Sequence, residues 1–118
     1  MKFLDLYNQD KRILNSIKKD FNQIIKKSDF ILGKKVFEFE EKFAKYCNTK
    51  FSISCANGTD AIYLAIKSLN LPENSEVIVP AMTYCSTIFS VLRAGYKPVL
   101  VDIDYNRSVV SAKEIKKN

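Results

Sequence analysis

The chain has no histidine and no tryptophan, and only three cysteines among its 118 residues. Without histidine, neither a histidine metal ligand nor a histidine general base is available. Three cysteines without C-x-x-C spacing argue against a disulfide framework and for reduced thiols. No apolar run is long enough to span a membrane, and the first residues lack the apolar region of a signal peptide. We therefore expect a cytoplasmic protein that does not bind membranes.

The charge of the chain is positive, +6, from 19 Lys and Arg against 13 Asp and Glu. A basic chain can bind nucleic acid when its cations form a stripe interleaved with aromatic residues. Here the lysines are scattered in pairs on polar helix faces or at helix ends, where solvated lysine is the ordinary case. The pairs are Lys18-Lys19, Lys26-Lys27, Lys34-Lys35 and Lys116-Lys117. Nucleic acid is therefore not an expected partner.

The first part of the chain has helical periodicity. After a short leader, residues 1–9, apolar residues recur at helical spacing over 10–27 and again over 35–46. In the second helix we expect Val36, Phe39 and Phe43 to face inward. These patterns predict two amphipathic helices in an N-terminal helical segment, residues 1–50.

The remainder alternates between strand and helix patterns. Apolar runs predict buried strands at 51–56, 76–79 and 98–104, each followed by a helix pattern. Gly95 suits the left-handed position after the second of these helices, and Ser111 with Glu114 forms a capping box for the third. Strand–helix alternation predicts an α/β fold with a parallel sheet flanked by helices.

The turn between the first strand and its helix carries the candidate binding residues Asn57, Gly58, Thr59 and Asp60. Glycine permits close approach of a ligand, and the first amides of a helix have no partner within it. Together with the helix dipole, these amides favour a phosphate or a carboxylate. The alternative is that Asn57 or Thr59 only caps the helix. The turn matches neither the P-loop nor G-x-G-x-x-G.

The other strands bring further side chains to the same edge of the predicted sheet. Tyr84 follows the second strand, and Asp102 and Asp104 end the third. Ligands of parallel sheets bind at the carboxyl ends of the strands. A phosphate site and an aromatic side chain there suit a planar phosphorylated ring, with Tyr84 stacked on its face. The two aspartates are the residues that would suggest a metal pair, but an Asp at a strand end is usually a loop or cap residue.

Five blocks of this sequence, in order and in spacing, resemble the DegT/DnrJ/EryC1/StrS family of pyridoxal-phosphate (PLP) dependent nucleotide-sugar aminotransferases. The resemblance spans nearly all of the chain. The blocks are Ile31-Leu32-Gly33 with Val36 and Phe39-Glu40; Asn57-Gly58-Thr59-Asp60-Ala61; Glu76-Val77-Ile78-Val79-Pro80; Thr83-Tyr84-x-Ser86-Thr87; and Gly95-x-x-Pro98-Val99-x-Val101-Asp102-Ile103-Asp104. The opening Phe3-Leu4-Asp5-Leu6 is also similar.

The resemblance implies the N-terminal part of a fold-type-I (aspartate aminotransferase-like) large domain, with residues 51–118 beginning the PLP-binding part. It implies that Gly58 and Thr59 hold the PLP phosphate and that Tyr84 stacks on the pyridine ring. Asn57 and Asp60 flank the site and are expected mainly to shape the turn. The resemblance assigns no metal.

The resemblance also implies an activity, amino transfer from an amino acid, with glutamate as the expected donor, to a nucleotide-linked keto sugar in a homodimeric enzyme. The Schiff-base lysine is expected downstream of Asn118, so no catalytic residue is predicted here and the chain is expected to be an inactive N-terminal fragment. Two alternatives stay open. One is a sugar dehydratase of the same family that uses pyridoxamine phosphate (PMP), with His in place of that lysine. The other is a non-catalytic phosphate-binding or regulatory module.

Overall fold

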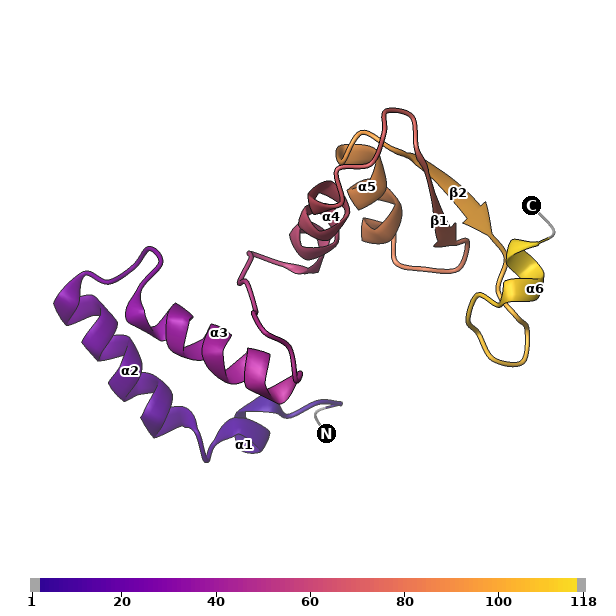
Figure 1. The fold of residues 1–118 in the computed structure, drawn as a ribbon. Helices are drawn as coiled ribbons and strands as arrows, with labels where there is room; N and C mark the ends of the chain where they lie inside the picture. The colour runs from indigo at the N-terminus through magenta and orange to yellow at the C-terminus, as the bar shows by residue number, and fades with distance from the viewer. Residues whose placement is uncertain (1–2, 117–118) are drawn as a thin grey trace. The chain divides into compact units, whose positions relative to one another are not determined.

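The computed structural model describes residues 3–116. The chain divides into two compact units, Met1–Ser54 and Cys55–Asn118. Figure 1 shows both units, and each is described by itself below. Two assignments stay predictions: residues 1–50 as a helical segment that packs on the large domain, and residues 51–118 as the start of the PLP-binding domain. No helix in the described residues has both the length and the apolar character needed to cross a membrane.

The first unit contains three helices, α1 Leu6–Asp10, α2 Leu14–Lys27 and α3 Lys34–Tyr46. The two predicted amphipathic helices are therefore present, but the first begins at Leu14 instead of residue 10. The leader is partly helical because the Asp5 carboxylate caps α1, accepting a hydrogen bond from the Asn8 amide at 3.2 Å. A turn closed by the Ile13 amide on the Asp10 carbonyl, at 2.9 Å, then separates α1 from α2.

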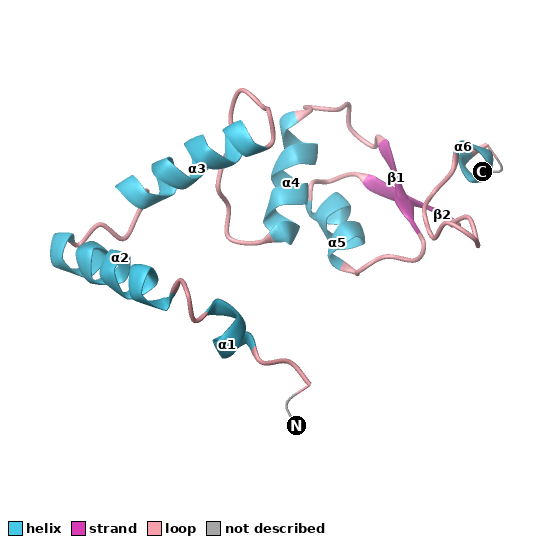
Figure 2. Cartoon of the chain, turned by 90° about the horizontal axis from the view of Figure 1, so that it is seen from below, coloured by secondary structure: helices cyan, strands magenta, loops and turns pink. Residues whose placement is uncertain are grey.

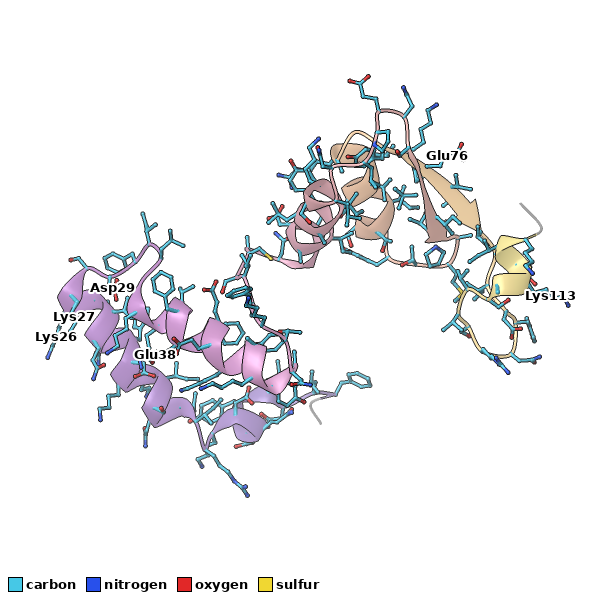
Figure 3. The ribbon with its side chains drawn as sticks, viewed as in Figure 1. Lys26, Lys27, Asp29, Glu38, Glu76 and Lys113 are labelled. Atoms are coloured by element: carbon cyan, nitrogen blue, oxygen red, sulfur yellow. The ribbon has the colours of Figure 1, made fainter. Side chains whose placement is uncertain are left out.

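Polar contacts join α2 to α3. The Lys35 ammonium lies 3.3 Å from a carboxylate oxygen of Asp20 on α2 and 3.2 Å from one of Glu38 on α3. The hydrogen bond to Glu38, followed by the one to Asp20, raises the pKa of Lys35 above its ordinary 10.5. Figure 3 shows Asp29 and Glu38 at this hairpin. The helices α2 and α3 are therefore joined at the surface of this unit by the ion pair between Asp20 and Lys35.

The apolar stripe of α3 is not buried within its unit. Phe39 and Phe43 were predicted to face inward, but they are 55% and 45% exposed. They stack on each other with ring centroids 5.4 Å apart, and Ala44 is the only buried residue of α3. The prediction of burial is wrong here because the ion pair that joins α2 to α3 lies at Lys35 and leaves this stripe exposed.

The second unit is a small α/β arrangement. In chain order it contains α4 Gly58–Ser68, β1 Glu76–Pro80, α5 Ser86–Arg93, β2 Lys97–Val101 and α6 Ala112–Ile115. The two strands pair in parallel, with Ile78 opposite Val99. Figure 2 shows α4 and α5 side by side, and α5 packs against both strands.

The core of this unit lies between the two helices and the strands. Val79 of β1, Val91 of α5, Ala94 and Tyr96 form the buried cluster, and Tyr63 of α4 packs against it. After α5 the chain turns at Gly95, whose φ of +86° is the left-handed conformation predicted for it. Ser111 caps α6 by accepting a hydrogen bond from the Glu114 amide, as the capping box predicts.

The first predicted strand, 51–56, is wrong: these residues have no regular structure. Among the described residues the sheet consists of β1 and β2 alone, so this run has no strand to pair with. The Ser54 amide instead donates to the Glu40 carboxylate at 2.7 Å, and Phe51 and Ile53 are 73% and 82% exposed. An apolar run needs a ladder partner as well as an apolar pattern to become a strand.

The third predicted strand is shorter than expected, because β2 ends at Val101. Asp104 folds into a turn in which one carboxylate oxygen accepts hydrogen bonds from the amides of Asn106 and Arg107, each at 3.0 Å. Asp102 accepts from the next amide, that of Ile103, at 2.8 Å. Both aspartates therefore serve the loop that follows the strand.

Candidate functional site at the first turn of α4

Asn57 is the N-cap of α4. Its backbone is extended, and its side-chain oxygen accepts a hydrogen bond from the Asp60 amide at 2.9 Å. Its side-chain amide donates to the Asp60 carboxylate at 3.1 Å. The backbone carbonyl of Asn57 accepts the amide of Ala61 at 3.0 Å. Asn57 and Asp60 therefore fix the shape of the turn, as a capping pair does.

The cap leaves the two preceding amides free. Within residues 3–116, the Gly58 and Thr59 amides and the Thr59 hydroxyl have no hydrogen-bond partner in the protein. A Cβ atom at Gly58 would meet no atom within 4 Å, and the φ of this glycine lies outside the left-handed region. Neither the backbone conformation nor the packing of this chain therefore requires glycine at position 58. The open space beside unpaired donors at a helix N-terminus suits a phosphate oxygen.

Ser90 of α5 is hydrogen bonded to the backbone of this turn. Its side chain is fully buried, and its hydroxyl lies 2.9 Å from the Thr59 carbonyl and 2.7 Å from the Ser86 carbonyl. The single hydroxyl proton is shared between these two acceptors. The Thr59 peptide is therefore tied to a second helix.

Arg93, three residues further along α5, contacts the same turn. Its guanidinium forms an ion pair with the Asp60 carboxylate and lies over the Tyr63 ring, with its central carbon 4.4 Å from the ring centroid. Asp60 thus pairs with Asn57 through one oxygen and with Arg93 through the other. The α4 turn is held through its cap and through its carboxylate.

Tyr84 lies in the loop before α5. The residue is 78% exposed, and its carbonyl accepts the Thr87 amide at 3.0 Å. The neighbouring hydroxyls of Thr83 and Thr87 are hydrogen bonded at 3.0 Å. The ring therefore has an open face. The structure connects this loop to the α4 turn through α5 and Ser90, while the stacking role of Tyr84 stays a prediction.

The pattern analysis missed Ser90 and Arg93. Both lie in a helix predicted from its apolar residues alone, and that pattern gives its polar residues no role. A one-turn spacing on α5 places both on the face toward α4, and only the packing of the two helices shows this. The available signal for Arg93 was its position as the one charged residue of α5, in the last turn of the helix.

Comparison with known proteins agrees with the family resemblance found in the sequence. The sequence profile of the DegT/DnrJ/EryC1/StrS aminotransferase family matches residues 11–118. The UDP-2-acetamido-2-deoxy-3-oxo-D-glucuronate aminotransferase of Pseudomonas aeruginosa is 40% identical over 104 residues, covering 88% of this chain and 29% of the relative. The dTDP-3-amino-3,6-dideoxy-alpha-D-galactopyranose transaminase of Aneurinibacillus thermoaerophilus has the same identity and coverage. The chain thus spans less than a third of the length of these curated relatives.

Solved structures show the same fold. DesV of S. venezuelae superposes with a TM-score of 0.90 at 28% identity, over 98% of this chain and 31% of that one. The E. coli GDP-4-keto-6-deoxy-D-mannose-3-dehydratase with bound hydrated PLP gives a TM-score of 0.76 at 26% identity, over 85% of this chain and 27% of that one. The predicted α/β fold class of PLP-dependent transferases is therefore confirmed, although the chain itself forms only two of the three expected strands.

Proposed function

The chain belongs to the DegT/DnrJ/EryC1/StrS aminotransferase family, and on this basis we propose that the full protein is a PLP-dependent aminotransferase acting on a nucleotide-linked keto sugar. The observation that carries the proposal is the first turn of α4. Its two unpaired amides and its free Thr59 hydroxyl border an open space at Gly58. Two of the relatives at 40% identity are named as sugar-nucleotide aminotransferases, and their names supply the substrate class.

The residues of this turn fit the phosphate of PLP. The amides of Gly58 and Thr59 and the Thr59 hydroxyl would donate to its oxygens, and the dipole of the eleven-residue helix α4 would favour its charge. Asn57 and Asp60 would keep the turn in shape, and Tyr84 would cover one face of the ring. When bound, PLP supplies the electron sink for moving an amino group.

The remaining parts of the site are proposals that the family resemblance supports. We place the lysine that carries the cofactor, and the acid that pairs with its ring nitrogen, outside residues 1–118. On that basis the 118-residue chain alone is expected to be inactive. The proposal includes glutamate as the donor, a homodimer as the active form and a cytoplasmic location.

A dehydratase is the second candidate, because a solved sugar-nucleotide dehydratase shares the fold at a TM-score of 0.76. The aminotransferase is favoured because the two curated aminotransferases are 40% identical to this chain, against 26% for the dehydratase. A non-catalytic phosphate-binding or regulatory module is the third candidate. It is supported by the geometry of the turn and by a Geobacillus stearothermophilus relative, 40% identical over 101 residues, that is named a pleiotropic regulatory protein.

The test is to incubate the purified full protein with PLP, glutamate and UDP- or dTDP-linked keto sugars. We expect 2-oxoglutarate and an aminated sugar nucleotide in equal amounts, measured by mass spectrometry. A sugar that loses a hydroxyl group without gaining nitrogen would instead identify a dehydratase. A protein that binds PLP but changes none of these sugars would contradict both enzymatic proposals.

A further inference from the structure

The first turn of α4 contains a charge that opposes the proposed ligand. Asp60 lies two residues after Gly58, within the turn whose amides would bind a phosphate. An unpaired carboxylate so near a phosphate would weaken its binding, since like charges at close range repel. A turn that binds phosphate therefore needs a counter-charge for Asp60.

Arg93 supplies this counter-charge. It is the basic residue in the last turn of α5, and its guanidinium pairs with the Asp60 carboxylate. Its position is restrained by the face of Tyr63, 4.4 Å away, so the pair does not depend on a freely moving side chain. The pair is partly exposed, with 57% of the Arg93 side chain and 27% of the Asp60 side chain accessible. The neutralisation is therefore expected to depend on salt.

Ser90 acts on the peptide next to this charge. Its buried hydroxyl donates to the Thr59 carbonyl, and it lies one helical turn before Arg93 on the same side of α5. The two residues therefore hold adjacent parts of the α4 turn, the Thr59 peptide and the Asp60 side chain.

We propose that Arg93 and Ser90 are positioning residues for a phosphate bound at the first turn of α4, Arg93 by neutralising Asp60 and Ser90 by fixing the Thr59 peptide. The inference rests on the proposed function, because it takes the phosphate of PLP as the ligand. It adds that the affinity for this phosphate depends on a second helix that does not contact the ligand.

The experiment compares PLP with pyridoxal, which has the same ring and aldehyde but no phosphate. The full protein is stripped of cofactor and titrated with each compound at low and at high salt. The measured quantity is the ratio of the two affinities, which isolates the contribution of the phosphate. A variant that only loosens the fold lowers both affinities and leaves the ratio unchanged.

Arg93→Met should lower the PLP-to-pyridoxal ratio by about threefold to fivefold at low salt and by less at high salt. Replacing Asp60 by Asn in the Arg93→Met protein should restore the ratio to within about twofold, because the unpaired charge is gone. The Asp60→Asn substitution does not restore the contact between Arg93 and the Tyr63 ring that Arg93→Met removes. Ser90→Ala should lower the ratio by about twofold to fivefold.

Lys67→Met is the matched control. Lys67 also joins α4 to α5, donating to the Ala94 carbonyl at 3.2 Å, but from the opposite end of α4. This variant should lower the melting temperature without changing the ratio.

The outcomes separate the two proposals. A parent protein that prefers PLP strongly, with Arg93→Met and Ser90→Ala at the parent ratio, overturns this inference and leaves the proposed function standing. An Arg93→Met defect that Asp60→Asn does not repair overturns the role of neutralisation. A parent protein with no preference for PLP over pyridoxal overturns the phosphate site and the inference together.

Discussion

Gly33 lies so close to Asp29 that a Cβ atom at position 33 would stand 2.6 Å from the carboxylate oxygen Oδ1. The other oxygen of this carboxylate accepts the Lys34 amide at 3.0 Å and so satisfies a free donor at the start of α3. Any side chain at position 33 must displace this carboxylate or the backbone of Asp29, whose carbonyl is 2.7 Å away. Gly33→Ala should therefore lower the free energy of unfolding of the full protein by about 1–3 kcal/mol, measured by urea denaturation.

Gly58→Ala is the matched substitution at an open position. A Cβ atom there meets no atom, and its backbone conformation is one that alanine adopts. We expect stability to stay the same or to rise by up to about 1 kcal/mol, because alanine restricts the unfolded chain. Strain in the turn is therefore not part of its effect. The PLP affinity should nevertheless fall, since the methyl group occupies the space beside the free amides. Unchanged affinity would place the phosphate elsewhere.

The pKa of Lys35 should respond to Glu38. Because a hydrogen bond to Glu38 is the largest cause of the raised pKa, Glu38→Gln should move it down toward 10.5. A raised lysine pKa stabilises the fold at pH values below the unfolded pKa, and this contribution is lost as pH rises through the folded pKa. An NMR titration of the lysine side chains measures the shift. A Lys35 titration that is the same in both proteins would show that the pair does not form in solution.

Two substitutions at Tyr84 distinguish ring stacking from hydrogen bonding by its hydroxyl group. Tyr84→Ala should weaken PLP binding by about 0.5–1.5 kcal/mol beyond the effect of lost buried area, whereas Tyr84→Phe should be nearly silent. The measurement is the PLP dissociation constant of the full protein. A large loss in Tyr84→Phe would instead assign the role to the hydroxyl group.

The sequence predicts well those features that depend on neighbours along the chain. The helical stripes, the left-handed Gly95, the cap at Ser111 and the boundary of α4 after Asn57 follow from local spacing and capping chemistry. Residues 51–56 show the limit, because an apolar run becomes a strand only beside another strand. The same limit applies to Phe39 and Phe43, whose burial depends on what covers them.

The same distinction between local pattern and tertiary packing applies to the candidate site. The turn with Gly58 and Thr59 can be identified from the sequence, since a strand-like run, a glycine and a helix pattern follow one another. The ion pair between Asp60 and Arg93 cannot, because 33 positions separate its members and only the packing of α4 on α5 brings them together. Local pattern therefore locates the turn, and tertiary packing shows what holds it.

The most direct test of the account is the PLP dissociation constant of Thr59→Ala in the full protein. Its hydroxyl has no partner in the described residues, so its removal should leave stability unchanged while removing a donor to a charged phosphate. Thr49→Ala is the control, because the Thr49 hydroxyl donates within the chain, to the Phe51 carbonyl at 3.0 Å. We predict that Thr59→Ala weakens PLP binding by roughly 1.5–3 kcal/mol and that Thr49→Ala does not. If Thr59→Ala holds PLP as tightly as the parent protein, the first turn of α4 is only a helix cap and the proposed site is wrong.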